Sequence, residues 1–342
     1  MLKKGVSNLV GQIIRMATTI ISIPILISLL GTELYGLWTW STTIISIFQL
    51  SEAGLSSGLI YFLSKNEHST ELKNQTLTNS IVLLLVSILF VILTILSFSF
   101  LLINLLPSSA QRYELELSIV LELGSILIAL RIIQNLYWSI LQSKQRYELL
   151  NVFQTVQIVT INASFIILAY FKLTYLPYFI IASIIITIIT IIILLKFLNI
   201  LQNFNWSFEI SNFKTFVKYN LRIWGGSIGS SIFTHGDKML IASLLGPSVL
   251  TVYTVFTNIC IQLNQLTAQV AHPIFPLISS YQEDNKANPN QIFKSFLKVF
   301  VLNITVSFGG SLFLICFSEE ILIFFLKENF KYEYIRLVAM EK

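Results

Sequence analysis

The segment PILISLLGTELYGLWTWSTTIISIFQLSEAGLSSG, residues 24–58, contains two apolar stretches joined by a short turn at residues 31–33. An α-helix rises about 1.5 Å per residue, so about 20 apolar residues cross the hydrocarbon core of a bilayer. The second stretch carries a carboxylate, Glu52, in an otherwise apolar run beside Gly54. The segment therefore predicts two membrane-spanning helices joined by a turn, with one acidic side chain among apolar neighbours.

The turn is repeated in the second half of the chain. ASLLGPSVLTVY, residues 242–253, matches ISLLGTELYGLW, residues 27–38, with the turn glycine and an aromatic residue in the same places. A helical hairpin that recurs in this way is typical of a membrane protein built from two related halves.

The composition excludes a soluble domain for most of the chain. Of 342 residues, 55% are hydrophobic and 11% are charged, and the mean hydropathy is +0.77, whereas soluble domains average about 25% charged residues. The net charge of +5 does not indicate nucleic-acid binding, because lysine and arginine lie mainly in short loops between apolar runs. Cys260 and Cys316 lie inside apolar runs and suggest neither a disulfide nor a metal site. The sequence predicts an all-α polytopic membrane protein.

The apolar runs form two groups separated by the most polar interval of the chain. We predict a first lobe of six helices over residues 1–200, a cytoplasmic connecting segment over 201–222 and a partial second lobe over 223–342. A tenth helix begins near Tyr334 and stops, so the second lobe is incomplete, and we expect a truncated chain with about nine to ten spans. The predicted helices cover residues 9–30, 34–63, 77–106, 119–141, 152–170, 179–198, 223–245, 249–270 and 296–317.

The charges of the loops predict the orientation. Cytoplasmic loops of membrane proteins carry an excess of lysine and arginine. If the N-terminus is cytoplasmic, the outer loops before the C-terminal tail hold only Arg112 and Lys172. The inner side then holds Lys3, Lys4, Lys65, Lys73, Lys144, Arg146, Lys214, Lys218, Lys286 and Lys294. We therefore expect a multi-pass protein of the bacterial cytoplasmic membrane with its N-terminus inside.

Four of the predicted helices carry polar residues, mostly at steps of three or four. Ionisable groups at membrane depth cost about 2.5–3.5 kcal/mol each, so they face a cavity or a partner. Four polar helix faces therefore predict a water-filled cleft between the lobes. These polar residues are Asn8, Gln12, Arg15, Thr19 and Ser22; Arg131, Asn135, Trp138 and Gln142; Arg222, His235, Asp237 and Lys238; and Asn258, Gln262, Gln265 and Gln269. The candidate substrate-binding residues are Arg15, Glu52, Arg131, Asn135, Asp237, Lys238, Asn258 and Gln262.

Each candidate also has a structural interpretation. Polar helix faces join helices by hydrogen bonds, and Glu52 is a natural buried partner for Arg15. Asp237 and Lys238 can neutralise one another. The two arginines, Arg15 and Arg131, are the more informative residues, because the planar guanidinium offers a fork of donors that suits a phosphate.

Short motifs occur in a recognisable order along the chain. They are Pro24, Leu30-Gly31, Tyr35-Gly36-Leu37-Trp38, Glu52-Ala53-Gly54-Leu55, Asp237-Lys238, Ile241-Ala242, Leu245-Gly246 and Tyr253. This order resembles bacterial oligosaccharide and O-antigen flippases of the polysaccharide transport family, part of the multidrug/oligosaccharidyl-lipid/polysaccharide exporter superfamily. That family usually has an aspartate where this chain has Glu52, and usually has twelve or more spans in two lobes.

The resemblance implies a flippase and not an enzyme, with no cofactor. The cargo would be an undecaprenyl-pyrophosphate-linked oligosaccharide repeat unit, moved to the outer leaflet by alternating access for surface polysaccharide synthesis, as O-antigen or capsule. Arg15 and Arg131 would hold the pyrophosphate while amide side chains meet the sugars. H⁺ or Na⁺ is the candidate coupling ion, and a polysaccharide polymerase is a candidate partner.

Four alternatives stay open at this point. A multidrug cation antiporter of the same superfamily would need a cavity dominated by carboxylates and aromatic rings. A flippase for lipid II has the same architecture with a different sugar. A membrane enzyme would need a large outer loop or a clustered catalytic site, and the loops are short. An inactive fragment of any of these would fit the abrupt end at Lys342.

Overall fold

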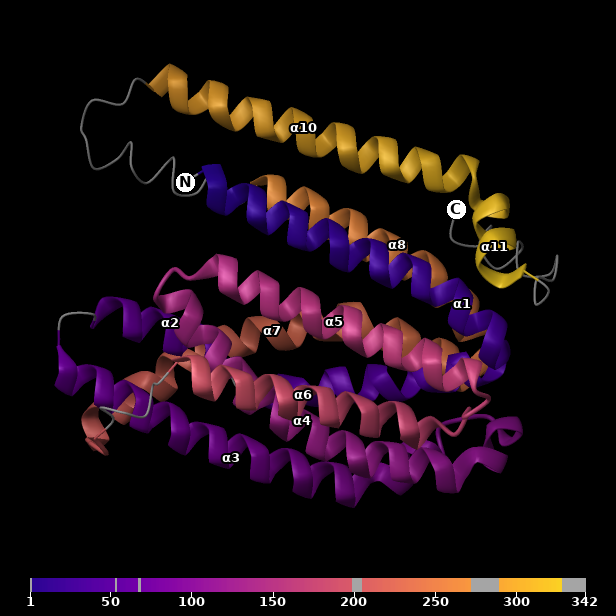
Figure 1. Cartoon of the computed structure of the whole chain (residues 1–342), viewed down its shortest axis with the longest axis horizontal. Coiled ribbons are helices and arrows are strands. Elements are labelled where there is room, and N and C mark those ends of the chain that lie inside the picture. Colours follow the sequence, from indigo (N-terminus) through magenta and orange to yellow (C-terminus); the bar gives the residue numbers. More distant parts are fainter. Residues whose placement is uncertain (1, 53, 67–68, 199–204, 272–288, 328–342) are drawn as a thin grey trace.

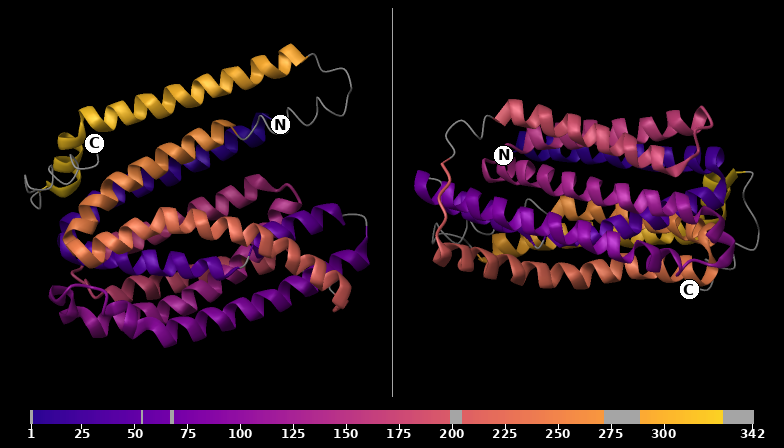
Figure 2. Two further views of the ribbon diagram at one scale, coloured as in Figure 1. Left: turned by 180° about the vertical axis from the view of Figure 1, so that it is seen from behind. Right: turned by 90° about the horizontal axis from the view of Figure 1, so that it is seen from below.

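A computed structural model describes residues 2–52, 54–66, 69–198, 205–271 and 289–327. Helices and short connections make up these residues, and none of them lies in a β-strand. Figures 1 and 2 show the long helices lying side by side, with their axes roughly along the longest dimension of the molecule. The prediction of an all-α protein is confirmed.

The first helix, α1 (Leu2–Phe48), contains the turn predicted at residues 31–33. It is broken at Gly31, whose φ of 78° and ψ of 165° are not helical. A residue with a side chain rarely adopts this conformation, whereas glycine does so without steric cost. The glycine therefore divides α1 into two helical arms, as the sequence predicts.

The predicted helix over residues 34–63 is interrupted, so the prediction of one continuous helix there is wrong. After α1 the chain forms a short 3₁₀ helix, η1 (Gln49–Glu52), and then α2 (Leu55–Lys65). Between them Gly54 has a left-handed conformation, with φ 71°.

The acidic residue explains why a new helix starts at this point. The carboxylate of Glu52 accepts a hydrogen bond of 3.0 Å from the backbone N–H of Ser56, in the first turn of α2. The first N–H groups of a helix have no partner within the helix and are stabilised by an acceptor or a negative charge. Glu52 therefore caps α2.

Four further long helices complete the first half of the chain. Each begins earlier than its apolar run, because its first turn contains charged residues or a proline that still fit a helix. They pack around a core in which Trp38 lies 5.1 Å from Phe165 and 5.5 Å from Phe179 between ring centroids. The elements are α3 (Thr70–Ile103), the 3₁₀ helix η2 (Ser108–Tyr113), α4 (Glu114–Ser143), α5 (Tyr147–Tyr170) and α6 (Leu176–Leu198).

The second half begins with the longest of its helices. The segment predicted as a connection, residues 201–222, is helical from Ile210 onward, because its charged residues keep a helical spacing while they lower the hydropathy. The last two helices are bent by 72° relative to one another. The elements are α7 (Ile210–Leu245), α8 (Pro247–Ala271), α10 (Pro289–Cys316) and α11 (Ser318–Leu326).

Fewer helical segments pass a test of length and hydropathy than the number of spans that the sequence predicts. Among the described residues, four helical segments are long and apolar enough to cross a membrane, or five if the bent pair of α10 and α11 is one span. The count of nine to ten spans therefore stays a prediction. The tenth helix predicted near Tyr334 lies outside the described residues.

The repeated turns have the same backbone conformation. Gly246, between α7 and α8, has φ 90° and ψ 171°, close to the values of Gly31. The second turn therefore reproduces the first in geometry as well as in sequence, which agrees with two related halves.

The two turns also pack directly against each other. A Cβ atom placed on Gly36 would lie 1.9 Å from the carbonyl oxygen of Pro247. Conversely, the hydroxyl of Thr251 donates a hydrogen bond of 2.6 Å to the carbonyl oxygen of Thr32. In the aligned repeats Gly36 corresponds to Thr251 and Thr32 to Pro247, so each turn presents the same two positions to the other, as in an interface with two-fold symmetry.

Replacing Gly36 with alanine is expected to destabilise the protein, because the added methyl group overlaps the backbone of Pro247. Overpacking of this kind costs about 1–3 kcal/mol. The measurement is the midpoint of thermal unfolding of the purified protein in detergent.

The matched control is Gly225→Ala, since no atom lies within 4 Å of a Cβ at that helical position. Alanine there is expected to be neutral or slightly stabilising. Equal midpoints for Gly36→Ala and Gly225→Ala would contradict the close contact of the two turns.

Candidate functional site

The candidate site is a cavity of about 450 Å³ between α1, α4, α5 and α8. Its size is within the range of small-molecule sites. Among the described residues, four carboxamides, one guanidinium, one indole and one aliphatic side chain form its lining, and no carboxylate does. The lining residues are Gln12, Arg15, Trp138, Gln154, Gln157, Ile158 and Gln265.

Hydrogen bonds hold the guanidinium of Arg15 in place. Its Nη1 donates to the hydroxyl of Thr155 at 3.0 Å, and its Nη2 donates to Oε1 of Gln12 at 2.8 Å. The other amide atom of Gln12, Nε2, donates to Oε1 of Gln265 at 2.6 Å. This chain of bonds links α1 to α5 on one side and to α8 on the other.

The positive charge of Arg15 has no negative partner in the part of the chain that the structure describes. The ion pair formed there is Arg112 with Glu33, and Arg112 is exposed. Both hydrogen-bond partners of the Arg15 guanidinium are neutral oxygen acceptors. An anion with oxygen atoms, such as a phosphate, could take up the donors of a guanidinium in a bidentate manner.

Glycine at position 11 gives the arginine room to reach Thr155. A Cβ atom at Gly11 would lie 3.3 Å from Nη1 of Arg15 and 3.3 Å from the hydroxyl oxygen of Thr155. Contacts this short are tight, so a side chain at this position would require the guanidinium or the hydroxyl of Thr155 to move by a few tenths of an ångström. Gly11 is therefore a part of the site that the sequence analysis did not single out.

The amides of α5 are supported by a second set of bonds. Gln157 and Gln134 of α4 exchange hydrogen bonds of 3.1 and 3.2 Å, and Gln157 also donates to the hydroxyl of Thr187 at 3.4 Å. These contacts fix the orientation of Gln157 at the cavity wall. Gln154 and Gln157 were not among the residues predicted for the site, although their spacing of three residues puts them near one another on one helix.

Glu52 and Asn135 lie together, but at a different place from Arg15. The carboxylate of Glu52 accepts a hydrogen bond of 2.8 Å from Nδ2 of Asn135 and bonds to both the backbone N–H and the hydroxyl of Ser56. Neither Glu52 nor Asn135 lines the cavity. Their contacts join η1 and α2 to α4, and a role of either residue in substrate binding stays a prediction.

The second predicted arginine is also separate from the cavity. Arg131 lies on α4, one turn from Asn135 and two turns from Trp138. It is partly buried and has no hydrogen-bond or ion-pair partner among the described residues, but it does not line the cavity. The structure therefore does not bring Arg15 and Arg131 together around this cavity.

The remaining candidates lie in the second half of the chain. The carboxylate of Asp237 accepts a hydrogen bond of 2.7 Å from the backbone N–H of Lys238 and another from the hydroxyl of Tyr253 on α8. The side chain of Lys238 is buried. Asn258 and Gln262 are partly buried on α8, and neither lines the cavity, whereas Gln265 of the same helix does.

Comparison with known proteins identifies a family and a fold. The family described as polysaccharide biosynthesis protein matches residues 1–282. A Shigella flexneri protein with a proposed assignment as an O-antigen transporter is 21% identical over 313 residues, which are 91% of this chain and 74% of that protein.

Two solved structures resemble the fold. A MOP superfamily transporter from Pyrococcus furiosus superposes with a TM-score of 0.66 at 14% identity, over 94% of this chain and 74% of its own. A MATE protein in complex with MaL6 superposes with a TM-score of 0.65 at 13% identity, over 99% of this chain and 76% of its own. The fold is therefore that of membrane transporters.

Replacing Glu52 with alanine is expected to lower the stability of the protein, because it removes the cap of α2 and leaves the amide of Asn135 without its acceptor. Hydrogen bonds to a charged group contribute about 1.5–3 kcal/mol. The thermal unfolding midpoint in detergent measures the effect.

Glu122→Ala serves as the comparison, since Glu122 is exposed on α4 and its carboxylate accepts a bond only from Ser118 among the described residues. A midpoint lowered as much by Glu122→Ala as by Glu52→Ala would argue against the capping role.

Proposed function

The chain belongs to the polysaccharide biosynthesis protein family, and we propose that it translocates undecaprenyl-pyrophosphate-linked oligosaccharide repeat units across the cytoplasmic membrane. The observation that carries the proposal is the cavity in which one unpaired guanidinium is surrounded by carboxamides. The family and the likeness to transporters support a flippase role. We propose in addition that the carrier lipid is undecaprenyl pyrophosphate and that transport occurs by alternating access.

The phosphate end of such a substrate would bind at Arg15. The guanidinium is already oriented by Thr155 and Gln12, so little conformational freedom is lost when an anion binds. A charged phosphate oxygen would take the place of one neutral acceptor of the Arg15 guanidinium. Hydrogen bonds between two charged groups are about twice as strong as those between neutral groups.

The sugar end would bind the amides and the indole. Carboxamides both donate and accept hydrogen bonds, which suits the hydroxyl and acetamido groups of a sugar. Trp138 adds a flat apolar surface, and its indole N–H is buried without an acceptor in the described residues.

Movement would occur between two lobes. We assign residues 1–200 to the first lobe, 201–222 to a cytoplasmic connection whose later part is the start of α7, and 223–342 to a partial second lobe. The cavity takes residues from α1, α4 and α5 of the first lobe and Gln265 of the second. A change in the packing of α1 against α8 would therefore open and close it, as alternating access requires.

The same proposal includes the orientation of the chain. Basic residues gather on the side of the N-terminus, which the positive-inside rule places in the cytoplasm. In this orientation, the lipid-linked substrate would enter the protein from the cytoplasmic leaflet and leave it into the outer leaflet.

Export of organic cations is a weaker candidate. A cation would need a carboxylate or a cage of aromatic rings. The described residues that line the cavity include no carboxylate and carry the charge of Arg15 instead.

A deletion strain complemented with Arg15→Ala is expected to carry at least about tenfold less surface polysaccharide than the same strain complemented with the unaltered chain. The reason is the loss of a charge-assisted contact of about 1.5–3 kcal/mol. Lipid-linked repeat units should accumulate inside the cell. Both quantities are measured with equal amounts of protein in the membrane.

Arg146→Ala is the matched control, since Arg146 is an exposed arginine of a loop and does not line the cavity. The proposal is wrong if Arg15→Ala restores polysaccharide as well as Arg146→Ala does, or if the deletion strain keeps its surface polysaccharide.

A further inference from the structure

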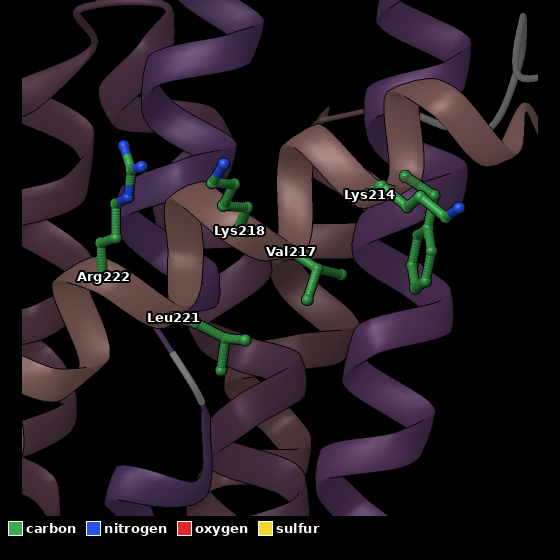
Figure 3. Close-up of a pocket in the computed structure, with 6 residues that line it drawn as sticks. Lys214, Val217, Lys218, Leu221 and Arg222 are labelled. Atoms are coloured by element: carbon green, nitrogen blue, oxygen red, sulfur yellow. The ribbon is translucent and has the colours of Figure 1, made fainter.

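The first third of α7 carries three cations on one face. Lys214, Lys218 and Arg222 follow each other at intervals of four residues, and all three are exposed. Figure 3 shows Lys218 and Arg222 extending to the same side of the ribbon, while Val217 and Leu221 extend to another side. Eight residues of helix span about 12 Å, so the three side chains form a basic ridge along two turns of α7.

This ridge faces away from the described elements against which α7 packs. α7 packs through Phe216 and Asn220, which are buried. Lys218 and Arg222 each follow one of these residues by two positions, which is about 200° around a helix. The ridge is therefore on the side of α7 opposite its packing face.

The packing face is firmly attached to the first half of the chain. Tyr219 stacks on Tyr61 of α2 at 4.7 Å between ring centroids, and the indole of Trp224 donates to the carbonyl oxygen of Leu50 at 2.6 Å. A Cβ atom on Gly58 would lie 2.0 Å from the amide oxygen of Asn220. The ridge is thus displayed on a helix whose position is fixed.

The charges of the ridge are not neutralised by the described residues. The nearest acidic residue in the sequence, Glu209, accepts hydrogen bonds from Ser211 and Asn212, and the ion pair of the described residues is Arg112 with Glu33. Like charges four residues apart destabilise a helix. An anionic ligand would offset this repulsion.

An apolar strip runs beside the ridge. Phe213, Val217 and Leu221 also follow each other at intervals of four, beside the three cations on the same helix. Two large side chains just before the ridge, Phe208 and Ile210, are exposed as well. A surface that is cationic along one line and apolar along the next suits an amphiphile better than a free sugar or a nucleic acid.

We propose that this surface of α7 is a binding site for an anionic phospholipid, with the phosphate on Lys214, Lys218 and Arg222 and the glycerol and upper acyl chain on Phe213, Val217 and Leu221. The site shares no residue with the cavity of Arg15. Its assignment therefore does not depend on the proposed function. A bound phospholipid would hold the start of α7 at the membrane surface.

The experiment titrates phosphatidylglycerol or phosphatidylethanolamine into the purified full chain in neutral detergent and counts the bound lipids by native mass spectrometry. The test variant is Lys214→Gln, Lys218→Gln, Arg222→Gln. Affinity for phosphatidylglycerol should fall roughly 100-fold, about fivefold for each removed charge. The matched control removes the same charge from exposed residues outside the ridge, as Lys65→Gln, Lys144→Gln, Arg146→Gln, and should retain the affinity.

Two further variants separate binding from folding. The charge-preserving variant Lys214→Arg, Lys218→Arg, Arg222→Lys should bind phosphatidylglycerol like the unaltered chain. The single variant Lys218→Gln should bind it about fivefold more weakly. Thermal unfolding midpoints are measured for every variant.

Several results would overturn the site. One is an equal loss in the control triple, which would indicate a general effect of charge. Another is equal affinity for the zwitterionic phosphatidylethanolamine. A third is a ridge variant that keeps phosphatidylglycerol but loses undecaprenyl pyrophosphate, because the site would then serve the lipid-linked substrate.

Discussion

The contact between the two glycine turns is the constraint on which the arrangement of the helices depends. Gly36 lies against the carbonyl of Pro247, and Thr251 bonds to the carbonyl of Thr32. These contacts fix how α8 lies along the N-terminal arm of α1, and Figure 1 shows α8 beside that arm. The same packing brings Gln265 of α8 to Gln12 of α1. A residue of the second half thereby reaches a cavity that is otherwise built by the first half.

Within that cavity one charge is left without a counter-charge among the described residues. Burying an unpaired ion is costly, and a chain of neutral hydrogen bonds only partly compensates for it. The guanidinium of Arg15 is instead held in position by Gln12 and Thr155, with Gly11 leaving space for it. Such a group is ready to bind an anion. The amides and the indole around it are suited to the neutral, hydroxyl-rich remainder of a glycolipid.

Part of this arrangement could be predicted from the sequence. The turns at Gly31 and Gly246 were predictable because glycine and aromatic residues recur at the same spacing, and Arg15 because a charge in an apolar helix needs a cavity or a partner. Helical periodicity shows which side of a helix is polar, but not which helices those sides meet. Arg131 and Trp138 share a face of α4 but lie about 10 Å apart along it, and only Trp138 lines the cavity. Glu52 could be recognised as unusual, whereas its role as the cap of α2 depends on the break at Gly54, which the apolar run conceals.

The central claim is that the chain itself moves a lipid-linked oligosaccharide across a bilayer. Its most direct test uses proteoliposomes that contain the purified chain and a fluorescent undecaprenyl-pyrophosphate oligosaccharide, with a membrane-impermeant quencher added outside. The account predicts that lipid initially protected on the inner leaflet becomes accessible to the quencher with the unaltered chain, and much more slowly with Arg15→Ala or in vesicles without protein. Equal rates in all three preparations would contradict it.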